Sequence, residues 1–317
     1  MARLRYLFYG TGAGAGVLAS QMWWVRAKFR LPPDACGPSA GVCLPPPSAS
    51  KPQTPDASRQ RNIVFLGDSI VTGVGCSREA SAEHGPVMPR RVAQTLAQQL
   101  GVAVGWSTIG ETGADVSMCR SRLLPRLQGE VQRVTTAGQR IDAVVVMTGL
   151  NDIKECFLFC QPTLHHWRFG YLLTSLLGSI GEMAGRQCSL VVPGTPVDAV
   201  PRFNELWPLS TAVCTITRLW EDQKRLAAEA AQAAAYSMQA CAAAESESQL
   251  ATTQATPTGG GRASVHFLEP PPEMIHRLKE GGRQTAYFAA DGMHPNDGKP
   301  PSACRKSCPK SRRKPHP

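Results

Sequence analysis

Three features are missing or scarce in this 317-residue chain, and each absence excludes or disfavours a class of protein or site. None of its eleven cysteines is paired with another at the C-x₂-C spacing of zinc sites, so the sequence predicts no structural zinc. Two close pairs have three residues between them: Cys156/Cys160 and Cys304/Cys308. The first pair is predicted to consist of buried or free thiols, with a local disulfide as the alternative. The redox compartment stays open.

The formal net charge of the chain is +10, and acidic residues are scarce at both of its ends. Residues 1–62 carry eight Lys or Arg and two acids, and residues 298–317 carry seven Lys or Arg and no acid. The middle, residues 63–297, has nineteen basic and twenty-two acidic residues. The globular part is therefore mildly acidic, which argues against nucleic acid as a partner.

Charge is absent between Tyr6 and Val25, and no acid precedes Asp34. Twenty uncharged residues are the length that a helix needs to cross a bilayer. Basic residues flank the run on both sides, and two tryptophans lie where an interfacial aromatic belt would be. The sequence therefore predicts membrane association through a single-pass N-terminal anchor within residues 1–30. A cleaved signal peptide of a secreted protein and an organellar transit peptide are the alternatives.

Composition divides the rest of the chain into segments. Residues 31–62 contain eight prolines, a composition typical of an extended linker, and we assign residues 31–60 to such a tether. A folded domain is predicted over residues 61–297, with 42% hydrophobic residues in the whole chain to supply its core. Residues from about 221 to 262 are read as an Ala-rich insertion in that domain, and residues 298–317 as a basic, Pro-rich tail.

Apolar runs alternate with helical patterns through this domain. Five runs are predicted to be strands: Ile63–Leu66, Val102–Ile109, Ile141–Thr148, Ser189–Val192 and Ser264–Leu268. Four stretches have a helical pattern: Met88–Leu100, Val116–Leu127, Thr163–Ala184 and Leu209–Ala244. Strands that alternate with helices predict a parallel α/β sandwich.

Three predicted strands end in residues suited to acyl-transfer chemistry. Ser69, in Gly67-Asp68-Ser69, follows the first strand, where its hydroxyl enters a cleft and its N–H faces a developing oxyanion. Gly113, after the second strand, lets the backbone approach a substrate closely. Asn151, after the third, has a neutral amide that donates to an oxyanion without carrying charge.

The fourth stretch is DGMHPND, near the end of the domain. Asp291 and His294 are three residues apart, so one turn brings the carboxylate to the imidazole, which then takes the serine proton. Each stretch alone has an ordinary explanation as a turn or a helix cap. Together they fill every role that an acyl-transfer site needs.

Other sites are disfavoured by the sequence. The nucleophile elbow of α/β-hydrolases requires G-x-S-x-G, and Val71 stands at its last position. His165 and His166 have no paired ligands nearby, so a surface or packing role is favoured over a metal site. The glycine-rich run 10–16 lies in no βαβ unit, so it predicts no dinucleotide cofactor.

The four stretches resemble the four blocks of the SGNH (GDSL-type) hydrolase family over roughly residues 63 to 296. The resemblance implies a flavodoxin-like three-layer α/β/α sandwich with a central five-stranded parallel sheet, without metal or cofactor. It also implies serine-dependent hydrolysis of carboxylic esters through an acyl-enzyme intermediate. The substrate would be a small-molecule or lipid ester, which the sequence does not specify further.

The resemblance also assigns roles to single residues. Ser69 would be the nucleophile, and Asp291 and His294 would complete the catalytic triad. Ser69, Gly113 and Asn151 would form the oxyanion hole.

One stretch departs from the family pattern. In the family the chain continues past the last block into a helix that packs on the sheet, whereas five prolines and seven basic residues follow Asn296 here. We therefore expect the C-terminal helix to be missing, either from the domain itself or because this end reflects a splice junction or reading frame. The alternative function is a catalytically inactive, membrane-linked interaction protein on the same scaffold.

Overall fold

The structure is a computed structural model that describes most of the chain. The described residues are 2–28, 32–46, 60–76, 85–159, 162–185, 187–197, 200, 206–250 and 263–279. Two of the predicted catalytic residues, Asp291 and His294, lie outside these ranges. The predicted loss of a C-terminal helix concerns residues that are likewise outside them.

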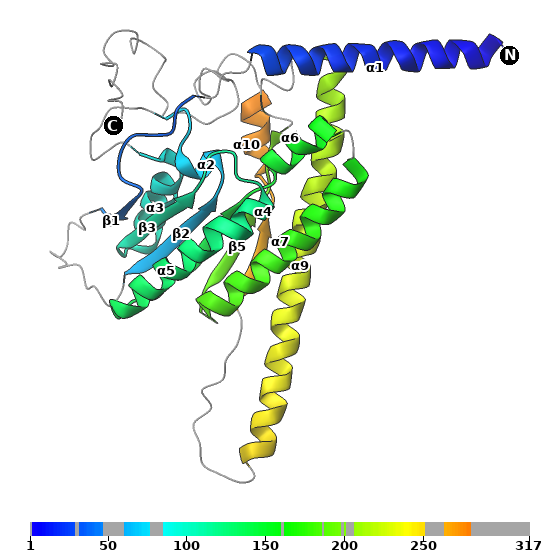
Figure 1. Cartoon of the computed structure of the whole chain (residues 1–317). Helices are drawn as coiled ribbons and strands as arrows, with labels where there is room; N and C mark the ends of the chain where they lie inside the picture. The colour runs from blue at the N-terminus through cyan, green and yellow to red at the C-terminus, as the bar shows by residue number, and fades with distance from the viewer. Residues whose placement is uncertain are drawn as a thin grey trace, which may run out of the picture.

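A six-stranded sheet forms the centre of the molecule (Figure 1). Its strands are β1 (Ala40–Cys43), β2 (Arg61–Gly67), β3 (Val104–Gly110), β4 (Ala143–Met147), β5 (Ser189–Pro193) and β6 (Ser264–Leu268). Their order across the sheet is β1-β3-β2-β4-β5-β6. The last five are mutually parallel, and β1 is antiparallel to β3 at the edge. The predicted α/β fold is confirmed, and the five predicted strands are the five parallel ones.

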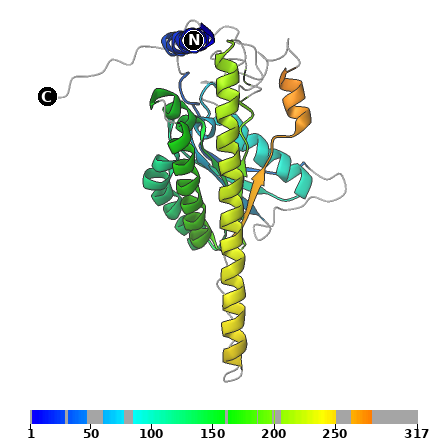
Figure 2. The same cartoon turned by 90° about the vertical axis from the view of Figure 1, so that its right-hand side faces the viewer.

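Helices cover both faces of the sheet. The helices of the described residues are α1 (Ala2–Lys28), α2 (Ser69–Thr72), α3 (Val87–Leu100), α4 (Val116–Met118), η2 (Cys119–Leu123), α5 (Leu124–Thr136), α6 (Leu150–Phe159), α7 (Pro162–Ala184), α9 (Leu209–Leu250) and α10 (Pro272–Lys279). Figure 2 shows α5 and α7 on one side of the sheet and α3 on the other. The sequence pattern did not predict α6 or α10, because neither has an extended amphipathic period bounded by clear caps.

Alternate side chains of β2 reach two separate cores. Val64 and Leu66 belong to a large apolar cluster with residues of α5, α7 and α9. Ile63 and Phe65 point to the opposite face and pack with residues of α3. A strand with both faces buried reads as a continuous apolar run, which is why β2 was recognisable from its sequence.

Part of the Pro-rich segment is packed on the domain. Within the predicted tether, Ala40–Cys43 forms β1, whose Cα partners lie in β3. The carbonyl oxygen of Pro33 accepts a hydrogen bond from Gly75 N at 3.3 Å, and that of Ser39 from Thr108 N at 2.8 Å. This stretch therefore borders the parallel sheet as an edge strand, and the domain boundaries themselves stay a prediction.

The N-terminal helix does not meet the requirements of a transmembrane helix. Within the part of the chain that the structure describes, no helix, α1 included, combines the length and apolarity that crossing a membrane requires. The predicted transmembrane helix is therefore not supported. The physical reason is that four glycines and the polar residues Thr11, Ser20 and Gln21 lower the mean apolarity of the uncharged run.

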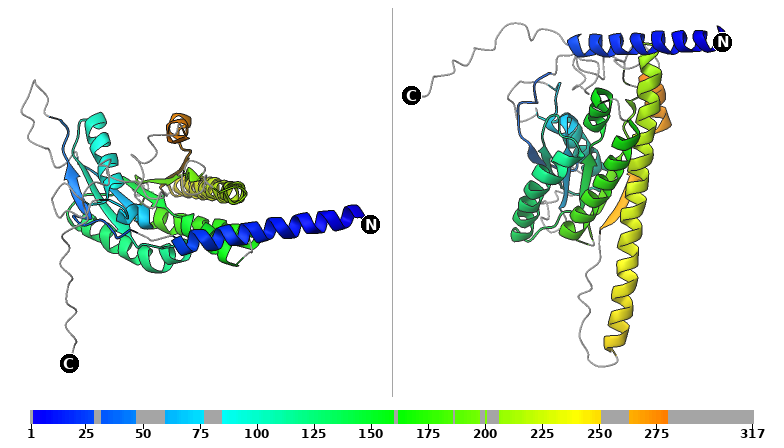
Figure 3. Two further views of the ribbon diagram at one scale, coloured as in Figure 1. Left: turned by 90° about the horizontal axis from the view of Figure 1, so that it is seen from above. Right: turned by 45° about the vertical axis from the view of Figure 1, so that its right-hand side comes forward.

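The second half of α1 packs against the start of α9 (Figure 3). Leu18, Met22 and Val25 contact a small apolar cluster of Val197, Leu209 and Val213. The amide of Gln21 donates from Nε2 to the carbonyl oxygen of Trp207 at 2.7 Å, and its Oε1 accepts from Leu209 N at 3.1 Å. Gln21 thereby satisfies a backbone donor in the first turn of α9.

Candidate active site

The carboxyl ends of three neighbouring strands bring three of the four predicted blocks to one edge of the sheet. Gly67, the last residue of β2, is in register with Gly110 of β3 and with Met147 of β4. The loops that follow these strands therefore leave the sheet at one edge. Ligands of open parallel α/β sheets bind at this edge.

Ser69 is the first residue of α2 and is 5% exposed. The preceding residue, Asp68, is the N-cap: its Oδ1 accepts a hydrogen bond from Ile70 N at 3.0 Å. The backbone N–H of Asp68 also donates to the carbonyl oxygen of Met147 at 3.3 Å. The acid of Gly-Asp-Ser thus caps the helix and fixes the backbone on which the serine stands.

A glycine is required at position 67 by the close approach of β4. A Cβ atom placed there would lie 2.0 Å from the carbonyl oxygen of Met147, a backbone atom that cannot move aside alone. The strand therefore ends in glycine because the neighbouring strand leaves no room for a side chain. This contact sets the position from which Asp68 and Ser69 turn out of the sheet.

Asn151 is joined to the loop that contains Gly113. Its Nδ2 donates a hydrogen bond to the carbonyl oxygen of Ala114 at 3.0 Å. Its Oδ1 accepts from Lys154 Nζ, also at 3.0 Å, which fixes the direction in which the amide faces. Because an amide has two N–H groups, one remains beyond the bond to Ala114. Gly113 itself has a φ of 88°, a left-handed conformation that favours glycine.

Asp152 makes a second link between the same two loops. Each of its carboxylate oxygens lies 3.3 Å from the backbone nitrogen of Val116. Burial raises the pKa of Asp152 to about 7, opposed by the Val116 hydrogen bond and assisted by the nearby charge of Asp115. Sequence reasoning missed this residue, although it stands in the GLND stretch beside Asn151.

Asp34 ties the Pro-rich segment to the site. Its Oδ1 accepts from the hydroxyl of Thr72 at 3.0 Å and from the hydroxyl of Thr112. The two threonine oxygens are 2.8 Å apart. Thr72 ends α2 and Thr112 precedes Gly113, so one carboxylate braces both loops. No motif in the sequence pointed to it.

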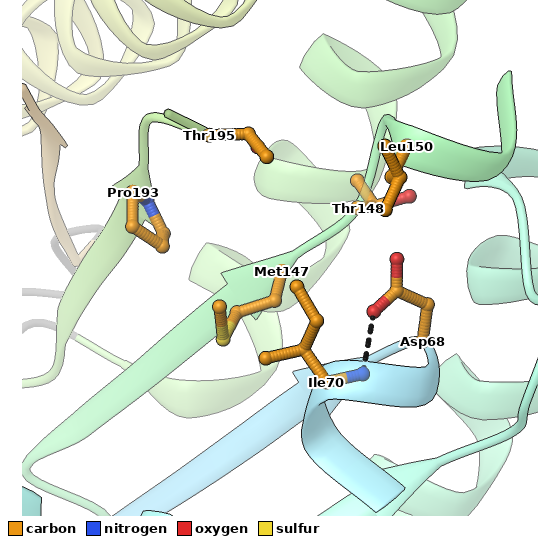
Figure 4. A pocket seen from close by; sticks show the side chains of 7 residues that line it. All are labelled: Asp68, Ile70, Met147, Thr148, Leu150, Pro193 and Thr195. Carbon is orange, nitrogen blue, oxygen red and sulfur yellow. Dashed lines mark hydrogen bonds between the residues drawn. The ribbon is translucent and has the colours of Figure 1, made fainter. Parts of the chain in front are cut away.

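A pocket opens next to Asp68 and Ile70, the two chain neighbours of Ser69, although Ser69, Gly113 and Asn151 are not among the residues that line it (Figure 4). It is lined by Asp68, Ile70, Met147, Thr148, Leu150, Pro193 and Thr195. Its empty volume is about 230 Å³, part of which is open solvent. The lining includes both chain neighbours of Ser69 and the residue before Asn151, so the structure places the pocket between the first and third blocks.

A match to a protein-family model identifies the family of this chain. The model of the GDSL-like lipase/acylhydrolase family matches residues 65–298, which is most of the chain. The chain belongs to this family. It is accordingly a hydrolase that acts on esters, and the resemblance seen in its four sequence blocks is confirmed. The matched range includes Asp291 and His294.

Solved structures of other proteins are similar to this chain over more than half of its length. A lipase from a goat rumen metagenome has 13% sequence identity and a TM-score of 0.46, over 74% of this chain and 90% of that one. A variant of an acetyl-xylooligosaccharide esterase from Geobacillus has 15% identity and a TM-score of 0.45, over 74% and 86%. An extracellular lipase from Streptomyces rimosus has 16% identity and a TM-score of 0.37, over 54% and 77%. No match was found among curated proteins.

The pocket wall of this GDSL-like hydrolase also involves a buried lysine of α9. Lys224 is 1% exposed, and its Nζ donates to the hydroxyl oxygen of Thr195 at 2.6 Å. Sequence reasoning missed both residues. A signal for Thr195 existed, because it is the first polar side chain after a buried strand, but a lysine within a long helix is usually solvent-exposed.

His166 has a packing role, as the sequence favoured. It is 9% exposed, and its ring centroid lies 6.1 Å from that of Trp220 in α9. Its neighbour Trp167 has a centroid 5.4 Å away. Within the described residues, no group of three His, Cys, Asp or Glu side chains is placed to hold a metal ion.

Proposed function

We propose that this chain hydrolyses carboxylic esters through a covalent acyl-enzyme formed on Ser69. His294 acts as general base and then as general acid, and Asp291 holds its imidazole in the required tautomer. The N–H groups of Ser69 and Gly113 and the amide of Asn151 stabilise the tetrahedral oxyanion. Water then attacks the acyl-enzyme and releases the acid.

One observation carries the proposal: the Asn151 amide is bonded to Ala114 in the Gly113 loop, at the sheet edge where Ser69 begins α2. A donor held before substrate arrives costs no reorganisation when the oxyanion forms. The family match, which extends past His294, supports the presence of the remaining partner. Ile70 and Leu150 in the pocket lining offer apolar surface to a substrate next to these donors.

The test uses the full chain, because β1 and Asp34 contact the domain and a fragment from Arg61 would lack them. The protein is incubated with a fluorophosphonate probe and with short-chain p-nitrophenyl esters, and the labelled residue is identified by mass spectrometry. We expect labelling at Ser69, burst kinetics, and loss of both in Ser69→Ala. His294→Ala should slow acylation and deacylation together. Folded wild-type protein that shows neither labelling nor turnover would contradict the proposal and favour the inactive-scaffold alternative.

The substrate is proposed as a small-molecule or lipid ester. Neither cofactor nor nucleic acid has a place in the proposed mechanism. Association with a membrane through residues 1–30, and secretion or organellar targeting as its alternatives, stay predictions from the sequence.

A further inference from the structure

Lys224 is a buried lysine whose hydrogens all have acceptors. Its Nζ donates to Thr195 Oγ1 at 2.6 Å, to Glu221 Oε1 at 2.9 Å and to the carbonyl oxygen of Pro193 at 3.4 Å. A lysine ammonium has three hydrogens, so this set of acceptors is complete. Two of the three acceptors belong to residues that line the pocket. The lysine therefore joins α9 to the pocket wall.

Lys224 and Glu221 both form a hydrogen bond with Thr195. Glu221 Oε1 accepts from the backbone nitrogen of Thr195 at 3.1 Å, while Lys224 donates to its hydroxyl oxygen. Since lysine only donates, the hydroxyl of Thr195 must accept this bond, and its own hydrogen is directed elsewhere. Among the residues that the structure describes, none accepts that hydrogen. Figure 4 places Thr195 and Pro193 across the pocket from Asp68.

The aliphatic part of Lys224 lies close to the loop of the third block. A Cβ atom built on Gly149 would be 3.1 Å from Lys224 Cε. Gly149 comes two residues before Asn151, whose amide is the proposed oxyanion donor. One side chain thus packs against the oxyanion loop and bonds to the pocket wall, so it fixes the spacing between them.

We propose that Thr195 determines specificity by donating its hydroxyl hydrogen to an oxygen atom of the substrate group that enters the pocket. Lys224 and Glu221 are positioning residues that hold this hydroxyl, and the bond from Lys224 polarises it into a better donor. The favoured substrates are esters that carry an ether or hydroxyl oxygen near the ester bond, rather than all-carbon analogues. The inference rests on the proposed ester hydrolysis and names the substrate class of that site.

The experiment compares two pairs of esters that differ by one oxygen in place of a methylene group. One pair varies the acyl part: p-nitrophenyl methoxyacetate and p-nitrophenyl butyrate. The other varies the alcohol part: 2-methoxyethyl acetate and butyl acetate. Each kcat/KM is divided by the rate constant of alkaline hydrolysis, which removes intrinsic reactivity. Wild-type protein should prefer the oxygen-bearing member of at least one pair.

Thr195→Val should lower that preference roughly tenfold, the usual effect of losing one hydrogen bond to a neutral group. Thr195→Ser keeps the hydroxyl and should keep the preference. A purely structural role for Thr195 would instead lower kcat/KM equally for both members of a pair. An equal loss, or a wild-type protein without preference in either pair, would overturn the proposal.

The positioning role is tested with Lys224→Met combined with Glu221→Gln, because removing the lysine alone would leave the Glu221 carboxylate without its cationic partner. This double variant should lose the preference mainly through KM, while fluorophosphonate labelling of Ser69 persists. The matched control combines Arg225→Met with Asp222→Asn. Arg225 and Asp222 form an ion pair of the same i,i+3 spacing one residue further along α9, but both side chains are exposed. The control should retain the preference.

A binding measurement separates this inference from the proposed hydrolysis. In Ser69→Ala protein, ligand-observed NMR reports binding of the four esters without turnover. Adding Thr195→Val should weaken binding of the oxygen-bearing ester and leave its all-carbon partner unchanged. If Ser69 proved not to be a nucleophile, this readout would still support or overturn the role of Thr195.

Discussion

Asn151 donates a hydrogen bond from Nδ2 to the carbonyl oxygen of Ala114 at 3.0 Å, and this bond joins the loops after β3 and β4. Asn151→Ala removes both the bond and the remaining N–H that we assign to the oxyanion. We expect kcat to fall by roughly 10²- to 10³-fold with a smaller change in KM, as for other single oxyanion donors. Steady-state kinetics with a short-chain p-nitrophenyl ester measures the effect, and a loss below about tenfold would contradict the assignment.

Lys154 provides a control on the orientation of the same amide. Its Nζ donates to Asn151 Oδ1 at 3.0 Å from an exposed position. Lys154→Met removes this bond but leaves the amide and its contact with Ala114 in place. We expect a loss of kcat of only a few-fold, because the bond is solvent-exposed. A loss as large as that of Asn151→Ala would mean that the lysine itself takes part in the reaction.

Gly67→Ala tests why the first strand ends in glycine. The added Cβ would lie 2.0 Å from the carbonyl oxygen of Met147, so β2 and β4 would have to separate at the edge that holds Ser69. We expect the free energy of unfolding to fall by about 3 kcal/mol or more, as for severe backbone strain and overpacking. Urea denaturation followed by circular dichroism measures it.

The matched control is Gly129→Ala, in the middle of α5. A Cβ atom there would meet nothing within 4 Å, so the substitution adds helix propensity without a clash. It should stabilise the protein by about 0.5 to 1 kcal/mol. Equal effects of the two substitutions would mean that the contact with Met147 does not constrain residue 67.

The parallel sheet and the main helices were predictable because their signal is local. Runs such as Ile141–Thr148 are apolar on both faces, and the blocks that carry Ser69, Gly113 and Asn151 follow directly from such runs. β1 was not predictable, since Ala40–Cys43 is four residues long, lies among prolines and pairs with a strand about sixty residues away. A strand of this kind forms because a partner strand pairs with it, and its own sequence pattern does not predict it.

The residues that support the site could not be predicted from the sequence, for a related reason. Lys224 and Asp34 are charged residues whose ordinary place is the solvent-facing side of a helix or a linker. Their contacts with Thr195 and Thr112 bridge 29 and 78 positions in the chain. Because only folding brings such pairs together, neither their spacing in the sequence nor the residues next to them predict these contacts.

Asp34→Asn tests whether the Pro-rich segment supports the active site. The carboxylate accepts from Thr72 and Thr112, and an amide in its place accepts more weakly because it is uncharged. We expect kcat to fall about three- to tenfold and the free energy of unfolding to change by less than about 1 kcal/mol, since Asp34 is exposed.

A double-mutant cycle with Thr112→Val provides the check on Asp34. If the two residues act through their shared hydrogen bond, the effects on kcat of Asp34→Asn and Thr112→Val will be less than additive. Strict additivity would show that Asp34 and Thr112 influence the reaction independently, contrary to the brace described for the two loops.

Asp152 gives the protein a stability that depends on pH. Its pKa is raised to about 7 in the folded protein, mainly by burial, against 3.8 as its ordinary value. The folded state therefore holds a proton that the unfolded state releases, and stability falls as the pH rises from about 4 to about 7. Asp152→Asn mimics the protonated carboxyl and keeps an acceptor for Val116 N. We expect it to raise Tm by roughly 5 °C at pH 8 and to have little effect at pH 4.

The measurement is the Tm difference between Asp152→Asn and wild type from pH 4 to pH 8, which cancels the titration of all other groups. Asp222→Asn, which removes an exposed carboxylate on α9, is measured in the same way as the control for loss of a surface charge. A difference for Asp152→Asn that is flat, or that shrinks as the pH rises, would contradict the raised pKa. A difference that grows through pH 4 to 7 would identify the Asp152 carboxyl as a proton-binding link between the loops that carry Gly113 and Asn151.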